Sequence, residues 1–352
     1  MGIGQESDGY DWLYAPDAPR TTVQPSNPGS RSEIPPPVLP KTSATKQKRR
    51  RKGGFFRLLM LLFVAWLIFM IAVPLVAWQD IARIDADPGF DRPASGATTT
   101  FIVAGTDARP NDRSRGRTDT IMLLTFGSGP TVLTSIPRDS LVQIPGHGRT
   151  KVNAAYAYGG APLLVQTLEA ETGLRIDGLV LVGFDSLVSV VDAVGGIEVC
   201  PERELKDKDS KLDIKAGCQI VDGKTALAYS RNRKSFPTGD IARGQSQREV
   251  IGGIGTAVLT PATFLNPLRW AQVNNSAASA IAVSENVSMI EFARFAWALS
   301  NAMSGAGVNC TVPIRDLRVT WDAERANSYF THLRNGTAEQ LGALCTDNGL
   351  EE

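Results

Sequence analysis

Hydrophobic positions divide the chain into three zones. Residues 1–45 contain no apolar run long enough to build a core and are rich in Pro, Ser, Asp and Thr, which predicts disorder. Residues 58–78 carry no charge. As a helix rising about 1.5 Å per residue they span roughly 30 Å, the thickness of the hydrocarbon part of a bilayer. From about residue 97 short apolar runs alternate with helical stretches, a pattern typical of an α/β body.

The pattern within this body predicts a single α-β-α domain, in which helices flank a central mixed sheet, preceded by one transmembrane helix. Strands are expected at 100–104, 121–126, 132–136 and 179–183, with edge strands at 310–314 and 317–320. Helices are expected at 161–171, 184–194, 222–229, 241–259, 270–283, 288–303 and 322–333. No internal repeat is seen, so one body covers residues 97–345.

A basic run, residues 46–52, stands immediately before the apolar segment. Such a run holds its side of a first span in the cytoplasm. The expected order is a cytoplasmic tail at 1–57, an anchor at 58–78, a linker at 79–96 and an extracellular domain at 97–345. A nucleic-acid patch is the alternative for the basic run, and a cleaved signal peptide is the alternative for the span. The apolar stretch is long for a signal peptide, begins late, and precedes no small-x-small cleavage site.

Charge and composition limit the class of function. The chain has 352 residues, with 37 basic and 36 acidic side chains. Ten basic residues lie at or before Arg57, which leaves a mildly acidic body and argues against nucleic-acid binding. The two histidines, His147 and His332, are too few for a His-rich zinc site. The segment Gly223-Lys-Thr225 resembles the end of a phosphate-binding P-loop, but the required glycine is replaced by Cys218.

All four cysteines follow the predicted anchor, where an even number suggests disulfides. Four cysteines permit three pairings. Proximity in the sequence favours Cys200 with Cys218 and Cys310 with Cys345. Free buried thiols are the alternative.

Two aspartates stand at the ends of predicted strands. Asp107 follows the strand 100–104, and Asp119 opens the next strand. If these strands are neighbours, the two carboxylates can meet and hold Mg²⁺ together with a substrate phosphate. Taken alone, each aspartate is better explained as a turn former or a helix cap.

Basic and polar groups cluster near other predicted element ends. Asp240, Arg243 and Gln247 form one stripe of a predicted helix. The remaining members are Arg138, Lys151, Arg231 and Arg233. A solvated charged surface explains any one of them, but the set is typical of a diphosphate clamp, because guanidinium groups match phosphate oxygens bidentately. Residue spacing alone therefore predicts phosphoryl-group chemistry.

At these residues the sequence resembles the LytR-CpsA-Psr family of membrane-anchored cell-wall glycopolymer ligases. The matching segments are Val103-Ala-Gly-Thr-Asp-Ala-Arg109, Arg117-Thr-Asp-Thr-Ile-Met-Leu123, Ser135-Ile-Pro-Arg-Asp139, Lys151-Val-Asn-Ala-Ala-Tyr-Ala-Tyr-Gly-Gly160, Val191-Asp-Ala-Val-Gly-Gly-Ile-Glu-Val199, Asp222-Gly-Lys-Thr-Ala-Leu-Ala-Tyr-Ser-Arg-Asn-Arg233 and Gly239-Asp-Ile-Ala-Arg-Gly-Gln-Ser-Gln-Arg248.

The resemblance implies a glycopolymer phosphotransferase that moves a glycan from a polyprenyl pyrophosphate carrier to peptidoglycan through a phosphodiester bond. It implies that Asp107 and Asp119 hold Mg²⁺, supported by Arg109 and Arg117. It also implies that the diphosphate is bound by Arg138, Lys151, Arg231, Arg233 and Arg243, and that Asp240 and Gln247 complete the site. Asp240 is the preferred general base, and Asp107 is the second choice. Family members often carry a further C-terminal domain, whereas here a short helical extension is expected.

In this family the prenyl tail lies in an apolar tunnel, for which the faces at 184–194 and 241–259 are candidates; ordinary core packing is the alternative for both. Two other functions stay open. One is a hydrolase that cleaves the prenyl pyrophosphate at the same site. The other is a non-catalytic, lipid-binding wall regulator, although a binder would not need both metal carboxylates. The sequence does not specify the polymer.

Overall fold

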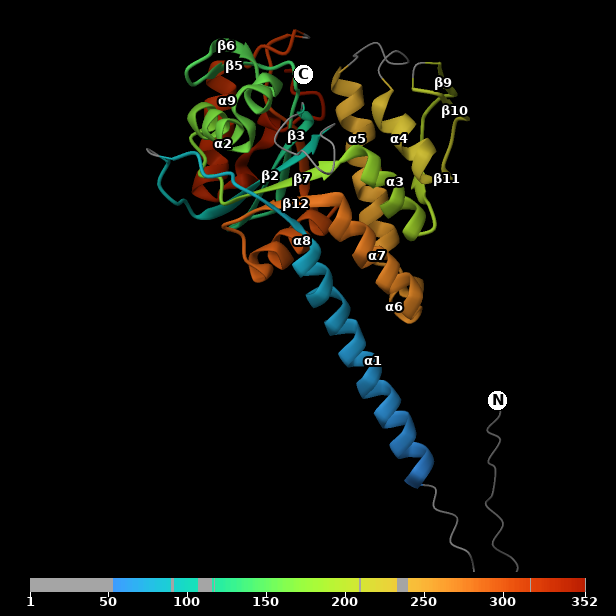
Figure 1. The fold of residues 1–352 in the computed structure, drawn as a ribbon. Coiled ribbons are helices and arrows are strands. Elements are labelled where there is room, and N and C mark those ends of the chain that lie inside the picture. Colours follow the sequence, from blue (N-terminus) through green and yellow to red (C-terminus); the bar gives the residue numbers. More distant parts are fainter. Residues whose placement is uncertain are drawn as a thin grey trace, which may run out of the picture. The chain divides into compact units, whose positions relative to one another are not determined.

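The computed structural model describes residues 53–89, 92–106, 116, 118–208, 210–232, 240–316 and 318–351, without the side chains of 184, 185 and 240–245. Residues 55–352 form one compact unit. Helix α1 (Gly53–Asp80) comes first and contains the whole uncharged segment (Figure 1). It is long and apolar enough to cross a membrane, and most of its large apolar side chains are exposed. It therefore fits a single-pass anchor.

The body is built on a seven-stranded sheet with the order β1-β12-β7-β2-β3-β4-β13. Its strands are β1 (Ala82–Ile84), β12 (Ile281–Ser284), β7 (Gly178–Gly183), β2 (Thr98–Thr106), β3 (Thr118–Gly127), β4 (Val132–Ile136) and β13 (Val308–Thr311). The pairs β1/β12, β2/β7 and β4/β13 are parallel, and the remaining three are antiparallel. The predicted mixed sheet is confirmed.

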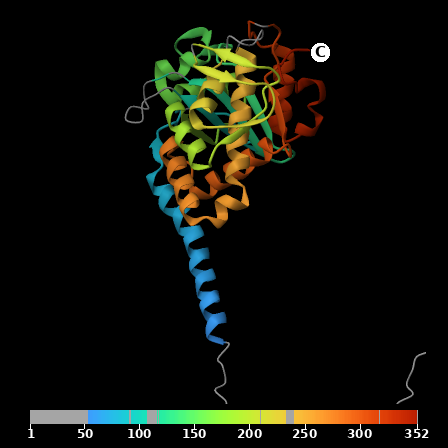
Figure 2. The same cartoon turned by 90° about the vertical axis from the view of Figure 1, so that its right-hand side faces the viewer.

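Helices cover both faces of this sheet, as Figures 1 and 2 show. Successive side chains of a strand point to opposite faces. In β2, Ile102 therefore packs in one core with α2 (Asn153–Thr172) and α9 (Ala323–Asn335). Its neighbours Phe101 and Val103 pack in a second core with α8 (Met289–Met303). The three layers agree with the predicted α-β-α arrangement, and burial on both faces explains why the central strands are continuous apolar runs.

A third core lies beside the sheet, among α3 (Phe184–Ala193), α4 (Gly223–Arg231), α5 (Asp240–Val258) and α7 (Pro267–Ala280). Short α6 (Pro261–Leu265) connects α5 to α7. The small strands β8 (Ile197–Val199), β9 (Leu205–Asp207), β10 (Leu212–Ile214) and β11 (Gln219–Val221) form two hairpin-like pairs. Disulfides join Cys200 to Cys218 and Cys310 to Cys345, which are the two pairings that proximity favours.

The structure corrects several expected elements. The helix expected at 270–283 ends at Ala280, because the next residues form β12 between β1 and β7. No strand forms at residues 318–320, where Val319 has a positive φ of 64° and a turn joins Ile314 to Trp321. Helix α2 begins eight residues before the expected start at 161, because it continues through a kink at Gly159 and Gly160.

Other elements had no signal strong enough to be predicted. Strand β1 falls inside the segment expected to be a linker and joins the sheet through β12. The hairpin of β5 (Leu141–Ile144) and β6 (Gly148–Lys151) was also not expected. This hairpin returns the chain to the start of α2 and so places Lys151 beside the end of β4.

Candidate active site

Asp119 and Arg138 form the centre of the site. The Arg138 guanidinium donates from Nη1 to Asp119 Oδ1 over 2.7 Å. Asp119 is the second residue of β3, and Arg138 comes two residues after β4 ends. Because β3 and β4 are antiparallel neighbours, the start of one lies at the end of the other. The side chains are 31% and 15% exposed, so water reaches the pair but the pair is partly screened from it.

Lys151 is brought to the same edge through Asp139. Its Nζ lies 2.9 Å from Asp139 Oδ1, and Arg138 Nε lies 4.0 Å from the same oxygen. The backbone fixes this arrangement, because the Asn153 amide donates to the Arg138 carbonyl. Charges of alternating sign therefore run from Asp119 through Arg138 and Asp139 to Lys151. Two of the predicted clamp cations lie together.

Gln247 joins these strand ends to α4 and α5. Its Nε2 donates to the carbonyl of Ser230 over 3.5 Å. Gln247 and Ser230 line a small cavity of about 40 Å³ together with Gly105 and Thr120. Thr120 adjoins Asp119, and Ser230 adjoins Arg231, the exposed last residue of α4. The sheet edge, the end of α4 and the buried face of α5 therefore meet at one place.

The rest of this small cavity is apolar. Its other walls are Val103 of β2, Val182 of β7, Leu187 of α3, and Val250 and Ile251 of α5. Leu187 and Val250, from the two faces that are candidates for an apolar tunnel, therefore meet here, and both also belong to the third core, as the alternative of ordinary core packing expects. At about 40 Å³ the space holds no more than a few water molecules. As it stands, this space is too small for a prenyl chain.

Sequence reasoning overlooked Arg248, the neighbour of Gln247. Arg248 is 8% exposed, and its Nη1 donates to Ser135 Oγ on β4. Among the described residues no carboxylate pairs with it. Burial lowers the pKa of Arg248, and the charge of Asp347 opposes that shift only in part. Buried cations normally have an anionic partner. The sequence signal that could have identified Arg248 is its position directly after the polar stripe that ends at Gln247.

Tyr229 and Glu249 fasten α4 and α5 to the Cys200–Cys218 loop. The Tyr229 hydroxyl donates to Glu249 Oε2 over 2.6 Å, and the Cys200 amide donates to Glu249 Oε1. Burial and the neighbouring Glu249 carboxylate raise the pKa of Tyr229, so the phenol stays protonated and donating. The disulfide loop thereby supports the helix that carries Gln247 and Arg248.

The remaining predicted residues fall outside what the structure describes. Asp107, Arg109, Arg117 and Arg233 lie outside the described residues. The backbone of Asp240 and Arg243 is in the first turn of α5, but their side chains are not described. Among the side chains that are described, no three His, Cys, Asp or Glu groups gather as a metal site. Thr106 of β2 pairs with Thr118 of β3, so the two strands are neighbours, as the pairing of Asp107 with Asp119 requires.

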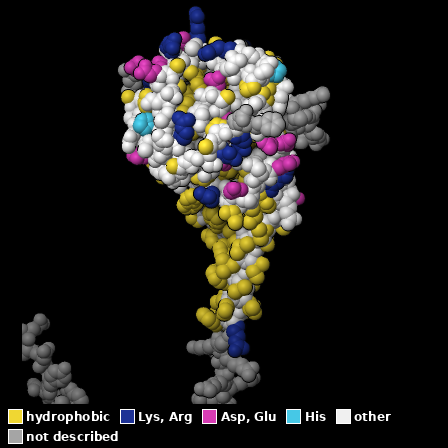
Figure 3. All heavy atoms as spheres, turned by 90° about the vertical axis from the view of Figure 1, so that its left-hand side faces the viewer, with side chains coloured by type: hydrophobic (Ala, Val, Ile, Leu, Met, Phe, Trp, Pro, Cys, Tyr) yellow, Lys and Arg dark blue, Asp and Glu magenta, His cyan; other side chains and the backbone are white. Residues whose placement is uncertain are grey.

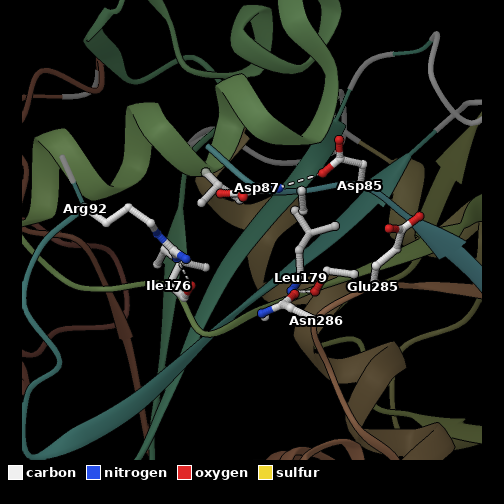
Figure 4. A pocket seen from close by; sticks show the side chains of 11 residues that line it. Asp85, Asp87, Arg92, Ile176, Leu179, Glu285 and Asn286 are labelled. Atoms are coloured by element: carbon white, nitrogen blue, oxygen red, sulfur yellow. Dashed lines mark hydrogen bonds between the residues drawn. The ribbon is translucent and has the colours of Figure 1, made fainter. Parts of the chain in front are cut away.

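A second polar pocket, of about 410 Å³, lies elsewhere and contains Asp85, Asp87 and Glu285 (Figure 4). It adjoins Gly178 at the start of β7, whereas the candidate site adjoins the ends of β2 and β4. Because β2 and β7 are parallel, these are opposite ends of the strands. The Arg92 guanidinium at this pocket forms an ion pair with Glu169, with 2.7 Å between Nη2 and Oε1. This pocket is separate from the candidate active site.

Relatives of the chain are cell-wall proteins. The probable cell wall biosynthesis protein LcpB of Corynebacterium glutamicum is 38% identical over 289 residues, which cover 76% of this chain and 68% of LcpB. The polyisoprenyl-teichoic acid–peptidoglycan teichoic acid transferase TagT of Bacillus subtilis is 35% identical over 188 residues, which cover 50% of this chain and 56% of TagT. The chain thus spans about half the length of that transferase.

Solved structures agree in fold. The LytR-Csp2A-Psr enzyme of Actinomyces oris superimposes with a TM-score of 0.59 at 22% identity, over 72% of this chain and 96% of that one. TagV of B. subtilis superimposes with a TM-score of 0.56 at 23% identity, over 69% of this chain and 98% of TagV. The profile of the LytR_cpsA_psr family matches residues 79–337, which include β1 and the entire sheet. The chain belongs to the LytR-CpsA-Psr family.

Proposed function

We propose that the protein transfers a glycopolymer from a polyprenyl pyrophosphate carrier to peptidoglycan, forming a phosphodiester bond. The observation that carries the proposal is the ion pair of Arg138 with Asp119 at the edge where Lys151, Ser230 and Gln247 also meet. A cluster of cations at a partly screened edge suits a diphosphate. The name of the relative TagT, a polyisoprenyl-teichoic acid–peptidoglycan teichoic acid transferase, supports the same chemistry.

In this proposal the donor's diphosphate lies against the guanidinium groups. Arg138 and Lys151 approach it from the strand edge, and Arg231 approaches it from the end of α4. Arg233 and Arg243 are assigned to the same clamp on the sequence resemblance. Arg248 joins this set, because it is a buried cation with no carboxylate partner among the described residues and it donates to Ser135 next to the same edge. Gln247 holds the end of α4 against α5.

Asp107 and Asp119 are proposed to hold Mg²⁺. Asp119 fits this role, because its carboxylate is 31% exposed and a hard oxygen donor, and Mg²⁺ commonly takes only one or two carboxylates together with substrate phosphates. When bound, the ion would neutralise charge on the phosphate oxygens. Arg138, which donates to Oδ1 of Asp119, holds that carboxylate in one orientation.

The transfer step forms one P–O bond and breaks another. The acceptor hydroxyl attacks the phosphorus attached to the glycan, and the bond from that phosphorus to the bridging oxygen breaks. Prenyl phosphate leaves with the bonding electron pair. The hydroxyl proton passes to a carboxylate, for which Asp240 is the first candidate and Asp107 the second; such a base contributes roughly 10²- to 10⁴-fold. The guanidinium groups stabilise the negative charge that spreads over the phosphoryl oxygens.

The prenyl chain is proposed to enter between the sheet and α5. The apolar walls of the small cavity, Val182, Leu187, Val250 and Ile251, adjoin the polar end at Gln247. The donor is amphiphilic, so its prenyl chain suits the apolar walls and its diphosphate suits the polar end. The proposal also places the basic residues 46–52 in the cytoplasm and the body outside the cell, following the charge rule for single spans.

The test uses the full chain in liposomes that contain a prenyl pyrophosphate glycan, with Mg²⁺ and added peptidoglycan. Glycan linked to the wall through phosphate is the expected product. Arg138→Ala should abolish it, whereas Arg149→Ala, on the exposed side of the β5–β6 hairpin, should not. Free glycan phosphate without attachment would identify a hydrolase. Intact donor would identify a lipid-binding regulator, and either result contradicts the proposal.

A further inference from the structure

Three leucines are exposed around α6. Leu259, Leu265 and Leu268 have 51%, 73% and 75% of their surface open to solvent. They lie within the segment 258–268, which contains no charged residue. We call these three leucines the apolar tip. An isolated exposed leucine is ordinary, but three large apolar side chains on one uncharged connection are typical of a contact surface.

The strand arrangement places the apolar tip on the side from which α1 arrives. Strands β1 and β12 are parallel neighbours, with Ala82 opposite Ala282. Each follows a helix almost directly: α1 ends at Asp80, and α7 ends at Ala280. Both helices therefore approach the same end of this strand pair, and α6 lies at the distant end of α7. Figure 1 shows α6 and α7 on the same side of the sheet as α1.

The length of α7 sets how far the tip extends. Its 14 residues span about 21 Å from β12. The same number of residues counted back from Asp80 reaches Leu67, in the middle of the exposed apolar part of α1. The tip thus extends to a depth at which α1 itself is uncharged and apolar.

Contacts hold the end of α1 against the body. The Trp78 ring lies 5.3 Å from the Phe292 ring of α8, and the Arg83 guanidinium lies 4.1 Å above Trp78. Arg83 also donates from Nη1 to the Val287 carbonyl over 3.0 Å. Ala77 and Ile81 are buried in the core below the sheet. These contacts restrict how α1 can turn relative to α7, and Figure 3 shows hydrophobic side chains gathering on the body where α1 joins it.

We propose that the apolar tip inserts into the leaflet of the phospholipid bilayer from which the body emerges. This inference rests on the proposed membrane anchoring by α1. A bilayer suits the tip better than a protein partner does, because the segment offers no charge for specific pairing and its depth matches apolar α1. Insertion also places the α6 end of α5, one wall of the proposed prenyl entrance, at the membrane surface.

Spin labels on the full chain in phosphatidylglycerol/phosphatidylcholine liposomes test this insertion. One label is attached through Leu265→Cys, and the matched control through Leu141→Cys, another exposed leucine on β5 at the far end of the body (Figures 1 and 2). The four native cysteines are in disulfides, so each variant has one reactive thiol. Collisions with oxygen, which partitions into lipid, and with a water-soluble nickel complex report the depth of each label.

The expected result is that the label at position 265 collides with oxygen and is protected from nickel, while the label at 141 shows the reverse. Equal nickel access at both positions, in protein that stays with the liposomes, would overturn the tip insertion and leave the anchor intact. Protein that washes off the liposomes would contradict the anchor, and this inference with it. The two failures are therefore distinguishable.

A charge variant supplies a functional readout. Leu265→Glu with Leu268→Glu changes exposed side chains only, so the core is not disturbed. The variant should remain in liposomes through α1 but transfer several-fold less from a long-chain donor in the bilayer. With a short-chain, water-soluble donor its turnover should equal that of the unaltered protein. Equal turnover with both donors would contradict the proposed role.

Discussion

Arg138 Nη1 and Asp119 Oδ1 are 2.7 Å apart, because Asp119 lies at the start of β3 and Arg138 follows the end of the neighbouring strand β4. The contact joins a predicted phosphate ligand to a predicted metal ligand, so neither group acts alone. Arg138 also lies near Asp139, which holds Lys151. Removing the Asp119 charge should therefore alter both the proposed metal site and the orientation of the nearest guanidinium.

Asp119→Asn should lower transfer by roughly 10²- to 10³-fold, the usual cost of losing one electrostatic group that acts on the transition state. The neutral amide binds Mg²⁺ weakly, so the Mg²⁺ concentration for half-maximal activity should also rise. Asp213→Asn, at an exposed aspartate of β10, is the matched control. Unchanged Mg²⁺ dependence in Asp119→Asn would argue against its role as a metal ligand.

Arg248→Met should separate stability from activity. Burial lowers the pKa of Arg248, which means that holding the cation in the fold costs free energy at every pH below that pKa. An apolar side chain of similar length removes this cost, so urea denaturation should show equal or greater stability. Transfer should fall if Arg248 meets the diphosphate. A variant that is destabilised but fully active would show that the residue is structural.

The disulfides should stabilise the body through loop closure. The bridges span 18 and 35 residues. Double serine variants are expected to lose about 3 kcal/mol at Cys200/Cys218 and about 4 kcal/mol at Cys310/Cys345 by the chain-entropy relation. Loss of the first bridge should also lower activity, because the Cys200 amide of its loop donates to Glu249 of α5. Thermal unfolding with and without reductant provides the measurement, and equal melting temperatures would contradict the expectation.

Asp177 should make stability depend on pH. Burial raises the pKa of its carboxyl, although the hydrogen bond from the Thr100 amide opposes this shift. The folded state then binds the proton more tightly than the unfolded state. Stability should therefore fall as pH rises from the ordinary aspartate pKa through the raised folded value. Asp177→Asn keeps an acceptor for the Thr100 amide and should flatten the pH dependence of the free energy of unfolding, measured by urea denaturation. An unaltered pH dependence in this variant would show that Asp177 is not its source.

Part of the sheet could be predicted, because several of its strands are recognisable from their local amino-acid sequence alone. Residues 132–136, Val-Leu-Thr-Ser-Ile, form a short run rich in residues that favour strands, and the structure has a strand at those same residues. Strand β12 could not be predicted in this way, because Ile281 and Val283 also continue the apolar pattern of α7. Only pairing with β1 and β7, far away in the sequence, makes that segment a strand. Tertiary pairing decides such ambiguous segments.

The site was predictable to a similar extent. Asp119, Arg138 and Lys151 carry strong charges near strand ends, and the structure brings them together. The ionic link through Asp139 was not foreseen, because it depends on the unexpected β5–β6 hairpin. Arg248 was overlooked because its importance comes from burial, which a helical stripe of polar residues does not reveal.

Binding of a prenyl pyrophosphate tests the central claim most directly. The full chain in detergent with Mg²⁺ is titrated calorimetrically with geranyl pyrophosphate, and Arg138→Ala is compared with Arg149→Ala. Loss of a hydrogen bond to a charged group costs about 1.5–3 kcal/mol, so Arg138→Ala should bind at least about tenfold more weakly, while Arg149→Ala should match the unaltered protein. Equal affinity in all three proteins would contradict a diphosphate site at Asp119 and Arg138.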